Sequence, residues 1–213
     1  MRKMILTIVM ACAGMAQAET VVITAFGDSL TQGYGLPAED GFVPQMQRWL
    51  DQQGAEVRLI NAGVSGDTTA GGAARVDWTL TPDVDGMILA LGGNDALRGL
   101  DPAAAHTNLA MIIETTQRAD VATLLVGMQA GGNFGPQYKE AFDNIYPALA
   151  QDYDVVYAPS FFAGLMQNGT LPPIAVLLPD LQSDGLHPNA QGVAKIVQGL
   201  GPQVLALVQR IKN

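Results

Sequence analysis

One stretch decides the fold: Val21-Val22-Ile23-Thr24-Ala25-Phe26-Gly27-Asp28-Ser29, an apolar run that stops at a glycine and is followed by an acid and a serine. Its β-branched start is typical of a strand buried on both faces. Gly27, and Gly33 shortly after it, supply the backbone freedom that a sharp turn requires. Ser29 is therefore a candidate nucleophile at a strand end. More often an Asp-Ser pair in this position caps the next helix, so the stretch alone leaves both interpretations open.

Further apolar runs of β type follow at residues 57–60, 87–91, 122–127 and 155–158. Between them, residues 42–50 and 103–114 repeat apolar side chains at helical spacing, and a closing helix follows Pro188. We expect Gly201-Pro202 to kink or interrupt that helix. Strands that alternate with helices are typical of a parallel sheet covered by helices on both faces. The sequence predicts one α/β domain, a three-layer αβα sandwich with five parallel strands.

The first residues have the pattern of a secretory signal peptide. Met1-Arg2-Lys3 is basic, residues 4–15 are mostly apolar, and Ala16-Gln17-Ala18 forms a small-x-small cleavage site. We therefore expect residues 1–18 to be removed and residues 19–213 to form the mature domain, located in the periplasm or secreted, with no membrane span. A buried N-terminal strand or helix is the alternative. A lipid anchor on Cys12 is disfavoured, because the apolar segment before it is very short.

Composition excludes several classes of chemistry. Cys12 is the only cysteine, so its removal leaves no thiol nucleophile, disulfide or cysteine metal site. The formal net charge is −9, and no basic cluster occurs anywhere in the chain. This balance argues against binding nucleic acid or an anionic membrane through charge. A small, neutral or apolar substrate fits better.

Polar clusters follow three of the predicted strands. The first contains Ser29, the second spans residues 61–68 and contains Gly66, and the third contains Asn94 within Gly92-Gly93-Asn94-Asp95. Each cluster alone is ordinary turn chemistry. Because ligands of such sheets bind outside the carboxyl ends of the strands, the three clusters together predict a site at that edge.

Histidine supply narrows the choice of a general base. The chain contains only His106 and His187, and His is the usual base for a serine nucleophile near neutral pH. His106 falls inside a helical pattern, whereas His187 follows Asp184 by three residues in a loop. This spacing lets Asp184 reach the imidazole Nδ1 while Nε2 faces Ser29. The alternative is that Asp184 and Pro188 only start the last helix.

Four blocks in order resemble the motifs of the SGNH, or GDSL-type, hydrolase family. They are Gly27-Asp28-Ser29-Leu30, the segment around Gly66, Gly92-Gly93-Asn94-Asp95 and Asp184-Gly185-Leu186-His187. The resemblance covers essentially all of the chain after residue 18. Residues 61–68, 92–99 and 141–147 are particularly similar to bacterial periplasmic arylesterases and acyl-CoA thioesterase/lysophospholipases. Such a match is specific for the family but much less so for the substrate.

The resemblance implies a flavodoxin-like fold and a serine esterase. Ser29 would attack the carbonyl, and His187 and Asp184 would complete the triad. The oxyanion hole would consist of the Ser29 and Gly66 backbone N–H groups and the Asn94 side-chain amide. We expect Asp28 and Asp95, which flank these residues, to hydrogen-bond loop amides. No cluster of acids or histidines at ligand spacing supports a metal, so no metal or cofactor is expected.

Substrate preference should depend on the loops between the blocks. Leu97, Arg98, Gly99 and Leu100 follow the asparagine block and are candidate substrate-binding residues. Residues 165–178 form either an acyl or aryl pocket or a packed surface loop, and residues 128–134 are a further candidate wall. We expect hydrolysis of aryl or acyl esters or thioesters. The alternatives are a carbohydrate O-deacetylase and a non-catalytic periplasmic protein that binds apolar ligands. Neither the chain-length preference nor the oligomeric state follows from the sequence.

Overall fold

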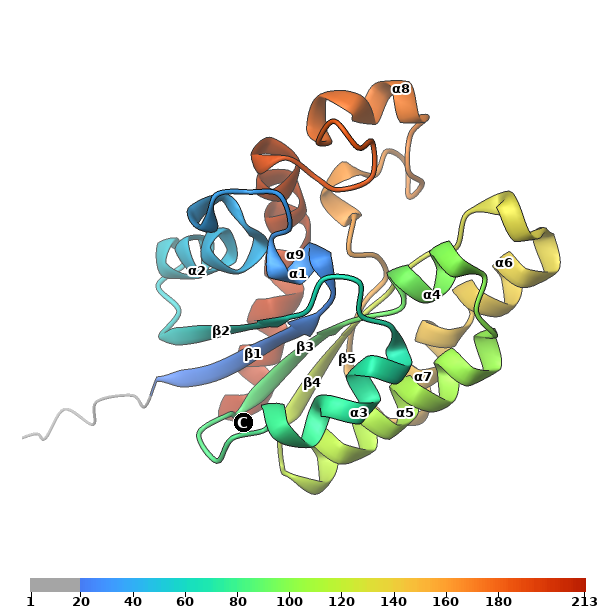
Figure 1. Cartoon of the computed structure of the whole chain (residues 1–213). Coiled ribbons are helices and arrows are strands. Elements are labelled where there is room, and N and C mark those ends of the chain that lie inside the picture. The colour runs from blue at the N-terminus through green and yellow to red at the C-terminus, as the bar shows by residue number, and fades with distance from the viewer. Residues whose placement is uncertain (1–19) are drawn as a thin grey trace, which may run out of the picture.

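A computed structural model describes residues 20–213 (Figure 1). The strands are β1 (Val21–Gly27), β2 (Val57–Gly63), β3 (Gly86–Ala90), β4 (Ala122–Val126) and β5 (Val156–Ala158). The helices are α1 (Ser29–Gln32), α2 (Phe42–Gln52), α3 (Thr69–Thr79), α4 (Gly93–Arg98), α5 (Pro102–Arg118), α6 (Pro136–Asp143), α7 (Ile145–Asp152), α8 (Ile174–Leu177) and α9 (Ala190–Lys212). Short 3₁₀ turns add η1 (Ala38–Asp40), η2 (Gly132–Phe134), η3 (Ala163–Leu165) and η4 (Leu178–Asp180).

The five strands form one parallel sheet in the order β2-β1-β3-β4-β5. Helices α2 and α9 pack together on one face, and α3, α5 and α7 cover the other, as Figure 1 shows. The predicted three-layer α/β sandwich is therefore confirmed. Because all strands run the same way, their carboxyl ends meet at one edge.

Strand β1 lies between β2 and β3 and is buried along its whole length. Ile23, Ala25 and Phe26 have no exposed surface. A central strand packed by helices on both faces needs apolar side chains at consecutive positions, which is why this stretch lacks the polar alternation of a half-exposed strand. The polar residues begin directly after it, at the edge where the other strands also end.

The predicted interruption of the closing helix is wrong, because α9 runs from residue 190 to 212 without a break. Pro202 lies inside it, flanked by the buried side chains Leu200 and Val204. Packing of both halves against the core outweighs the hydrogen bond that the proline removes. Gly201 has a packing role, since a Cβ there would clash with the indole of Trp49 on α2.

The connection from β5 to α9 is long and crosses the carboxyl edge of the sheet. It carries η3, α8 and η4, and α8 projects from the body of the molecule (Figure 1). Within residues 20–213, no helix combines the length and the apolar character needed to cross a membrane. The predicted signal peptide, residues 1–18, lies outside the part of the chain that the structure describes.

Candidate active site

The turn after β1 presents Ser29 as the first residue of α1. Asp28 is the N-cap, and its Oδ1 accepts a hydrogen bond from the Leu30 amide at 3.0 Å. The helix is only one turn long and ends at Gly33, which has a φ of 88°. The capping role that the sequence left open therefore belongs to Asp28, and the Ser29 hydroxyl is free to make another contact.

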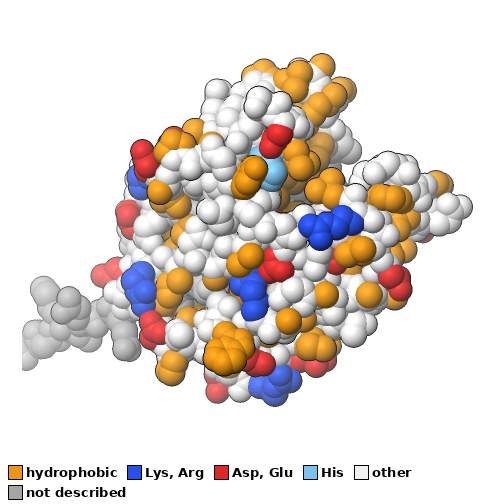
Figure 2. Space-filling view, viewed as in Figure 1, with side chains coloured by type: hydrophobic (Ala, Val, Ile, Leu, Met, Phe, Trp, Pro, Cys, Tyr) orange, Lys and Arg blue, Asp and Glu red, His pale blue; other side chains and the backbone are white. Residues whose placement is uncertain are grey.

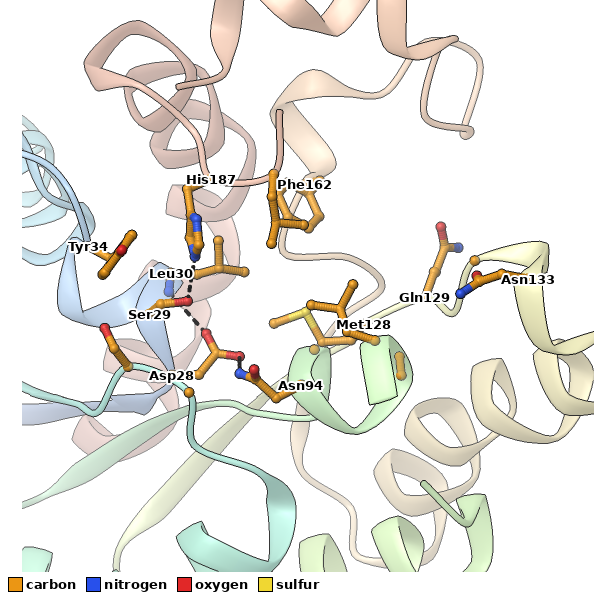
Figure 3. A pocket seen from close by; sticks show the side chains of 17 residues that line it. Asp28, Ser29, Leu30, Tyr34, Asn94, Met128, Gln129, Asn133, Phe162 and His187 are labelled. Atoms are coloured by element: carbon orange, nitrogen blue, oxygen red, sulfur yellow. Dashed lines mark hydrogen bonds between the residues drawn. The ribbon is translucent and has the colours of Figure 1, made fainter. Parts of the chain in front are cut away.

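Ser29, His187 and Asp184 form a chain of hydrogen bonds. Ser29 Oγ lies 2.9 Å from His187 Nε2, and His187 Nδ1 lies 2.7 Å from Asp184 Oδ2. Figure 3 shows the imidazole of His187 directed at the hydroxyl of Ser29. The arrangement has the geometry in which an imidazole takes a proton from a hydroxyl while a carboxylate holds its other nitrogen.

The loop around His187 is held by its own backbone. Asp184 Oδ1 accepts from the amides of Leu186, at 2.9 Å, and His187, at 3.0 Å. Gln182 ties the same loop to the turn after α1, because its Nε2 donates to the carbonyl of Tyr34 at 2.8 Å. The Tyr34 ring also packs against the imidazole, with ring centroids 4.7 Å apart. The position of His187 is thus fixed from two sides.

Gly66 and Asn94 lie on the other side of Ser29 and line the same cavity. Asn94 Nδ2 donates to Asp28 Oδ2 at 3.3 Å, which uses one of its two amide hydrogens. The Arg98 guanidinium donates to the Gly66 carbonyl at 3.0 Å and lies 3.4 Å from Asn94 Oδ1. Arg98 therefore connects the two elements that carry the predicted oxyanion donors.

Asp95 joins the Gly66 loop to α4. Its carboxylate accepts from the Thr69 amide at 2.9 Å and from the Thr69 hydroxyl at 2.6 Å, at the start of α3. Asp95 is buried, so both contacts are shielded from water. Asp28 and Asp95 thus hydrogen-bond backbone amides, as expected, but these amides lie in the first turns of α1 and α3 and not in loops.

The carboxyl groups of Asp28 and Asp184 differ in their pKa. Burial raises the pKa of Asp28 to about 6, and its hydrogen bonds with the Leu30 amide and the Asn94 side chain only partly offset that rise. Asp184 has its pKa lowered to about 2, mainly by the hydrogen bond from His187 and further by the two loop amides. Asp184 is therefore an anion throughout the neutral range and can stabilise an imidazolium.

The site opens into a cavity of about 330 Å³. Figure 3 shows Met128 and Phe162 across the cavity from Ser29. Apolar side chains supply much of its wall, and these are Leu30, Tyr34, Ala96, Leu97, Met128, Phe162 and Leu186. A cavity of this size and lining accommodates a small aryl group or a short acyl chain.

Some of the predicted substrate-binding segments line the cavity and others do not. Leu97 lines the cavity, whereas Arg98, Gly99 and Leu100 are not among its lining residues. Met128, Gln129, Gly131 and Asn133 form a wall, as expected of residues 128–134. Residues 165–178 contribute nothing to the lining. This segment runs from the end of η3 through α8, which projects from the body of the molecule (Figure 1). His106 lies on α5, on the face of the sheet that α3 and α7 share.

Three residues that support the site carry no signal in the sequence. Tyr34 and Gln182 act through contacts with distant segments. Arg75 on α3 donates to the carbonyls of Gly27 and Ala62, at the ends of β1 and β2, and pairs with Asp67 at 2.7 Å. That these two carbonyls accept from Arg75 becomes visible only when the strands β1 and β2 are paired in the folded chain.

Within residues 20–213 there is no group of three acids, histidines or cysteines arranged to hold a metal.

Comparison with known proteins agrees with this geometry. The model of the GDSL-like Lipase/Acylhydrolase family matches residues 25–195. Esterase TesA of Pseudomonas aeruginosa is 32% identical over 194 residues, which cover 91% of each chain. Thioesterase 1/protease 1/lysophospholipase L1 of Escherichia coli K12 is 34% identical over 194 residues, covering 91% of this chain and 86% of that protein. The crystal structure of AlinE4, an SGNH-hydrolase family esterase, is 41% identical with a TM-score of 0.71, covering 90% of this chain and 98% of that one.

The family model matches most of the chain, and these relatives align over nearly its full described length. Two of these relatives are named as esterases, and the third is named as a thioesterase, protease and lysophospholipase. The fold and the order of the four sequence blocks agree with the family match. The chain belongs to the GDSL-like, or SGNH, family of lipases and acylhydrolases, and it is an ester-hydrolysing enzyme.

Proposed function

We propose that the protein is a serine esterase that cleaves aryl esters and short to medium acyl esters or thioesters through an acyl-enzyme. The observation that carries this proposal is the hydrogen-bonded chain from Ser29 through His187 to Asp184 at the mouth of an apolar cavity. A nucleophile, a base and a group that orients the base are what acyl transfer requires.

In the first half of the reaction, Ser29 Oγ attacks the carbonyl carbon while His187 Nε2 takes the hydroxyl proton. Asp184 stabilises the resulting imidazolium through Nδ1. The tetrahedral oxyanion accepts hydrogen bonds from the backbone amides of Ser29 and Gly66 and from the Asn94 side chain. Collapse of the intermediate breaks the bond to the alcohol or thiol, which leaves with the proton from His187.

In the second half, water replaces the leaving group. His187 takes a proton from that water, the hydroxide attacks the acyl-Ser29 ester, and the proton returns to Ser29 as the acid departs. The substrate's apolar acyl or aryl group contacts the wall formed by Leu30, Met128 and Phe162. The names of the relatives support esters and thioesters as substrates.

A fluorophosphonate, which reacts with activated serines, tests the chemistry directly. We expect one adduct on Ser29 and none on the Ser29→Ala variant. A protein that only binds apolar ligands would remain unlabelled. Initial rates with p-nitrophenyl esters of increasing acyl length, beside an acyl-CoA, a lysophospholipid and an acetylated sugar, then rank the substrates. Activity confined to the acetylated sugar would favour an O-deacetylase instead.

We also propose that the enzyme is exported and that residues 1–18 are removed. The proposal rests on the basic start, the apolar run and the small residues at positions 16 and 18. Mass spectrometry of the protein from a periplasmic fraction should give a chain that begins at Glu19. An intact Met1 in that fraction would contradict cleavage.

A further inference from the structure

Exposed hydrophobic side chains gather on the side of the molecule where the cavity opens. Ten of the twelve large ones exposed among residues 20–213 lie in the loops, 3₁₀ turns and short helices that follow the strands, whereas Trp78 and Met111 lie on the longer helices α3 and α5. We call these ten the apolar rim, and they are Tyr34, Val64, Leu97, Leu100, Phe134, Leu171, Ile174, Val176, Leu178 and Leu186. Figure 2 shows hydrophobic side chains beside the histidine and over the segment that projects above it. Such clustering marks an interaction surface, whereas single exposed side chains do not.

The segment around α8 presents the most prominent part of the rim. Ile174, Val176 and Leu178 are 56%, 51% and 54% exposed, while Leu177 packs against the core and anchors the turn. Folding normally buries branched side chains of this kind. Here three of them point outward from a segment that does not line the cavity.

The segment around α8 has no charged side chain, which suits contact with an uncharged surface. Residues 155–179 contain no Asp, Glu, Lys or Arg, although charged residues make up 15% of the chain and its formal net charge is −9. Burial of this segment therefore desolvates no charge. The acidic remainder of the protein is repelled by an anionic membrane and is indifferent to a zwitterionic one.

The position of the rim also limits what can occupy it. Tyr34, Leu97 and Leu186 belong both to the rim and to the cavity lining. A protein seated permanently on the rim would close the entrance, whereas a lipid surface itself supplies acyl esters. We propose that the apolar rim docks the enzyme on zwitterionic lipid surfaces, with Ile174, Val176 and Leu178 inserted and the cavity facing the lipid.

This proposal rests on the proposed function for the identity of the substrate, and it adds the physical form in which that substrate is presented. An acyl chain would move from the lipid directly into the cavity without crossing water. Side chains that insert shallowly give reversible binding whose strength follows the apolar area buried. Docking and ester cleavage are then separable properties of different residues.

Binding is tested by co-sedimentation of the protein with phosphatidylcholine vesicles. The triple variant Ile174→Ser, Val176→Ser, Leu178→Ser should partition to vesicles at least about tenfold more weakly than the parent. The matched control, Trp78→Ser with Met111→Ser, removes exposed apolar side chains from the two positions outside the rim. It should bind as the parent does. Vesicles that contain anionic lipid should bind the parent less well than phosphatidylcholine alone at low salt.

Activity is tested on two forms of substrate. On micellar lysophosphatidylcholine the triple variant should lose at least about tenfold in kcat/KM, whereas on soluble p-nitrophenyl butyrate it should match the parent. That soluble-ester rate also shows that the variant is folded. As a single-site check, Ile174→Trp should show a blue-shifted tryptophan emission when phosphatidylcholine vesicles are added.

Equal vesicle binding by the parent and the triple variant would overturn the proposal, as would a parent that does not bind vesicles. A concentration-dependent dimer that the triple substitution dissolves, without vesicle binding, would instead assign the rim to a second copy of the chain and also overturn it. Failure of the proposed function has a different signature. The parent would then bind vesicles through the rim but would hydrolyse neither the soluble ester nor the micellar lipid.

Discussion

His187 Nε2 lies 2.9 Å from Ser29 Oγ, although 158 positions separate the two residues in the sequence. The parallel topology explains this approach, since Ser29 follows the inner strand β1 and His187 lies three residues before α9, which packs on the sheet. The Asp28 cap fixes one partner, and the hydrogen bonds of Asp184 fix the other. The proposed base and nucleophile, held in this way, need little rearrangement when a substrate binds.

Replacing His187 by Ala should lower kcat for p-nitrophenyl butyrate about a thousandfold or more, because Ser29 loses the group that removes its proton. His106→Ala is the matched control, since it removes the other histidine of the chain from α5, outside the cavity lining. Steady-state kinetics of both variants decide the question. A near-parent rate for the His187 variant, or a dead His106 variant, would refute the assignment.

Replacing Arg98 by Ala should lower kcat about tenfold and leave KM within about twofold. Its guanidinium holds the Gly66 carbonyl and lies beside Asn94 Oδ1, so its loss should loosen two donors that matter more in the transition state than in the ground state. Asn94→Ala, which removes a donor outright, should cost about a hundredfold or more in kcat. Initial rates over a range of substrate concentrations separate kcat from KM.

A double-variant cycle sharpens this test. If Arg98 acts through Asn94, the Arg98→Ala substitution should cost less when Asn94 is already Ala than in the parent. A different result would be that Arg98→Ala raises KM, by a factor that grows with the acyl length of the substrate, and leaves kcat unchanged. That pattern would make Arg98 a substrate-binding residue, as the sequence predicts, and would contradict a positioning role.

The fold could be predicted because consecutive apolar residues and helical spacing are local properties of the chain. Strand ends were less accurate, since they depend on pairing. β2 continues three residues beyond the predicted run 57–60 because residues 61–63 pair with β1. The predicted interruption at Pro202 was wrong for a related reason, since tertiary packing maintains α9 across a residue that local rules disfavour.

The candidate site likewise has features that the sequence predicts and features that only the folded chain shows. The hydrogen bonds that link Ser29, His187 and Asp184 agree with the sequence prediction, because residue type and strand-end position define them; their catalytic roles remain a proposal. Gln182 and Arg75 could not be found, since each acts on carbonyls that only the folded chain brings near. The path of residues 165–178 was also unpredictable, because an apolar composition suits a pocket wall and an exposed rim equally.

Gly164 should resist substitution because η3 packs directly on α9 at this point. A Cβ at Gly164 would clash with the Lys195 backbone carbonyl, and backbone inside a helix cannot move aside as a side chain can. Gly164→Ala should therefore lower the free energy of unfolding by about 1–3 kcal/mol. Gly132→Ala is the control, since a Cβ there meets no atom within 4 Å. Urea denaturation of both variants gives the comparison, and equal stabilities would contradict the close approach of η3 and α9.

Asp28 should make the stability of the enzyme depend on pH in the opposite sense to most carboxylates. Burial raises its pKa from 3.8 to about 6 in the folded chain, so the native state holds this proton more tightly than the unfolded state does. Its contribution is fully present only well below pH 3.8, where both states are protonated, and it is lost as the pH rises through 6. The side chain of the Asp28→Asn variant cannot ionise, so the variant does not lose this stability as the pH rises. The stability of the variant relative to the parent, measured by urea denaturation at pH 4 and pH 7.5, should therefore shift in favour of the variant by about 2 kcal/mol at the higher pH. A relative stability that stays constant, or that shifts in favour of the parent, would show that Asp28 ionises as easily in the native state as in the unfolded chain.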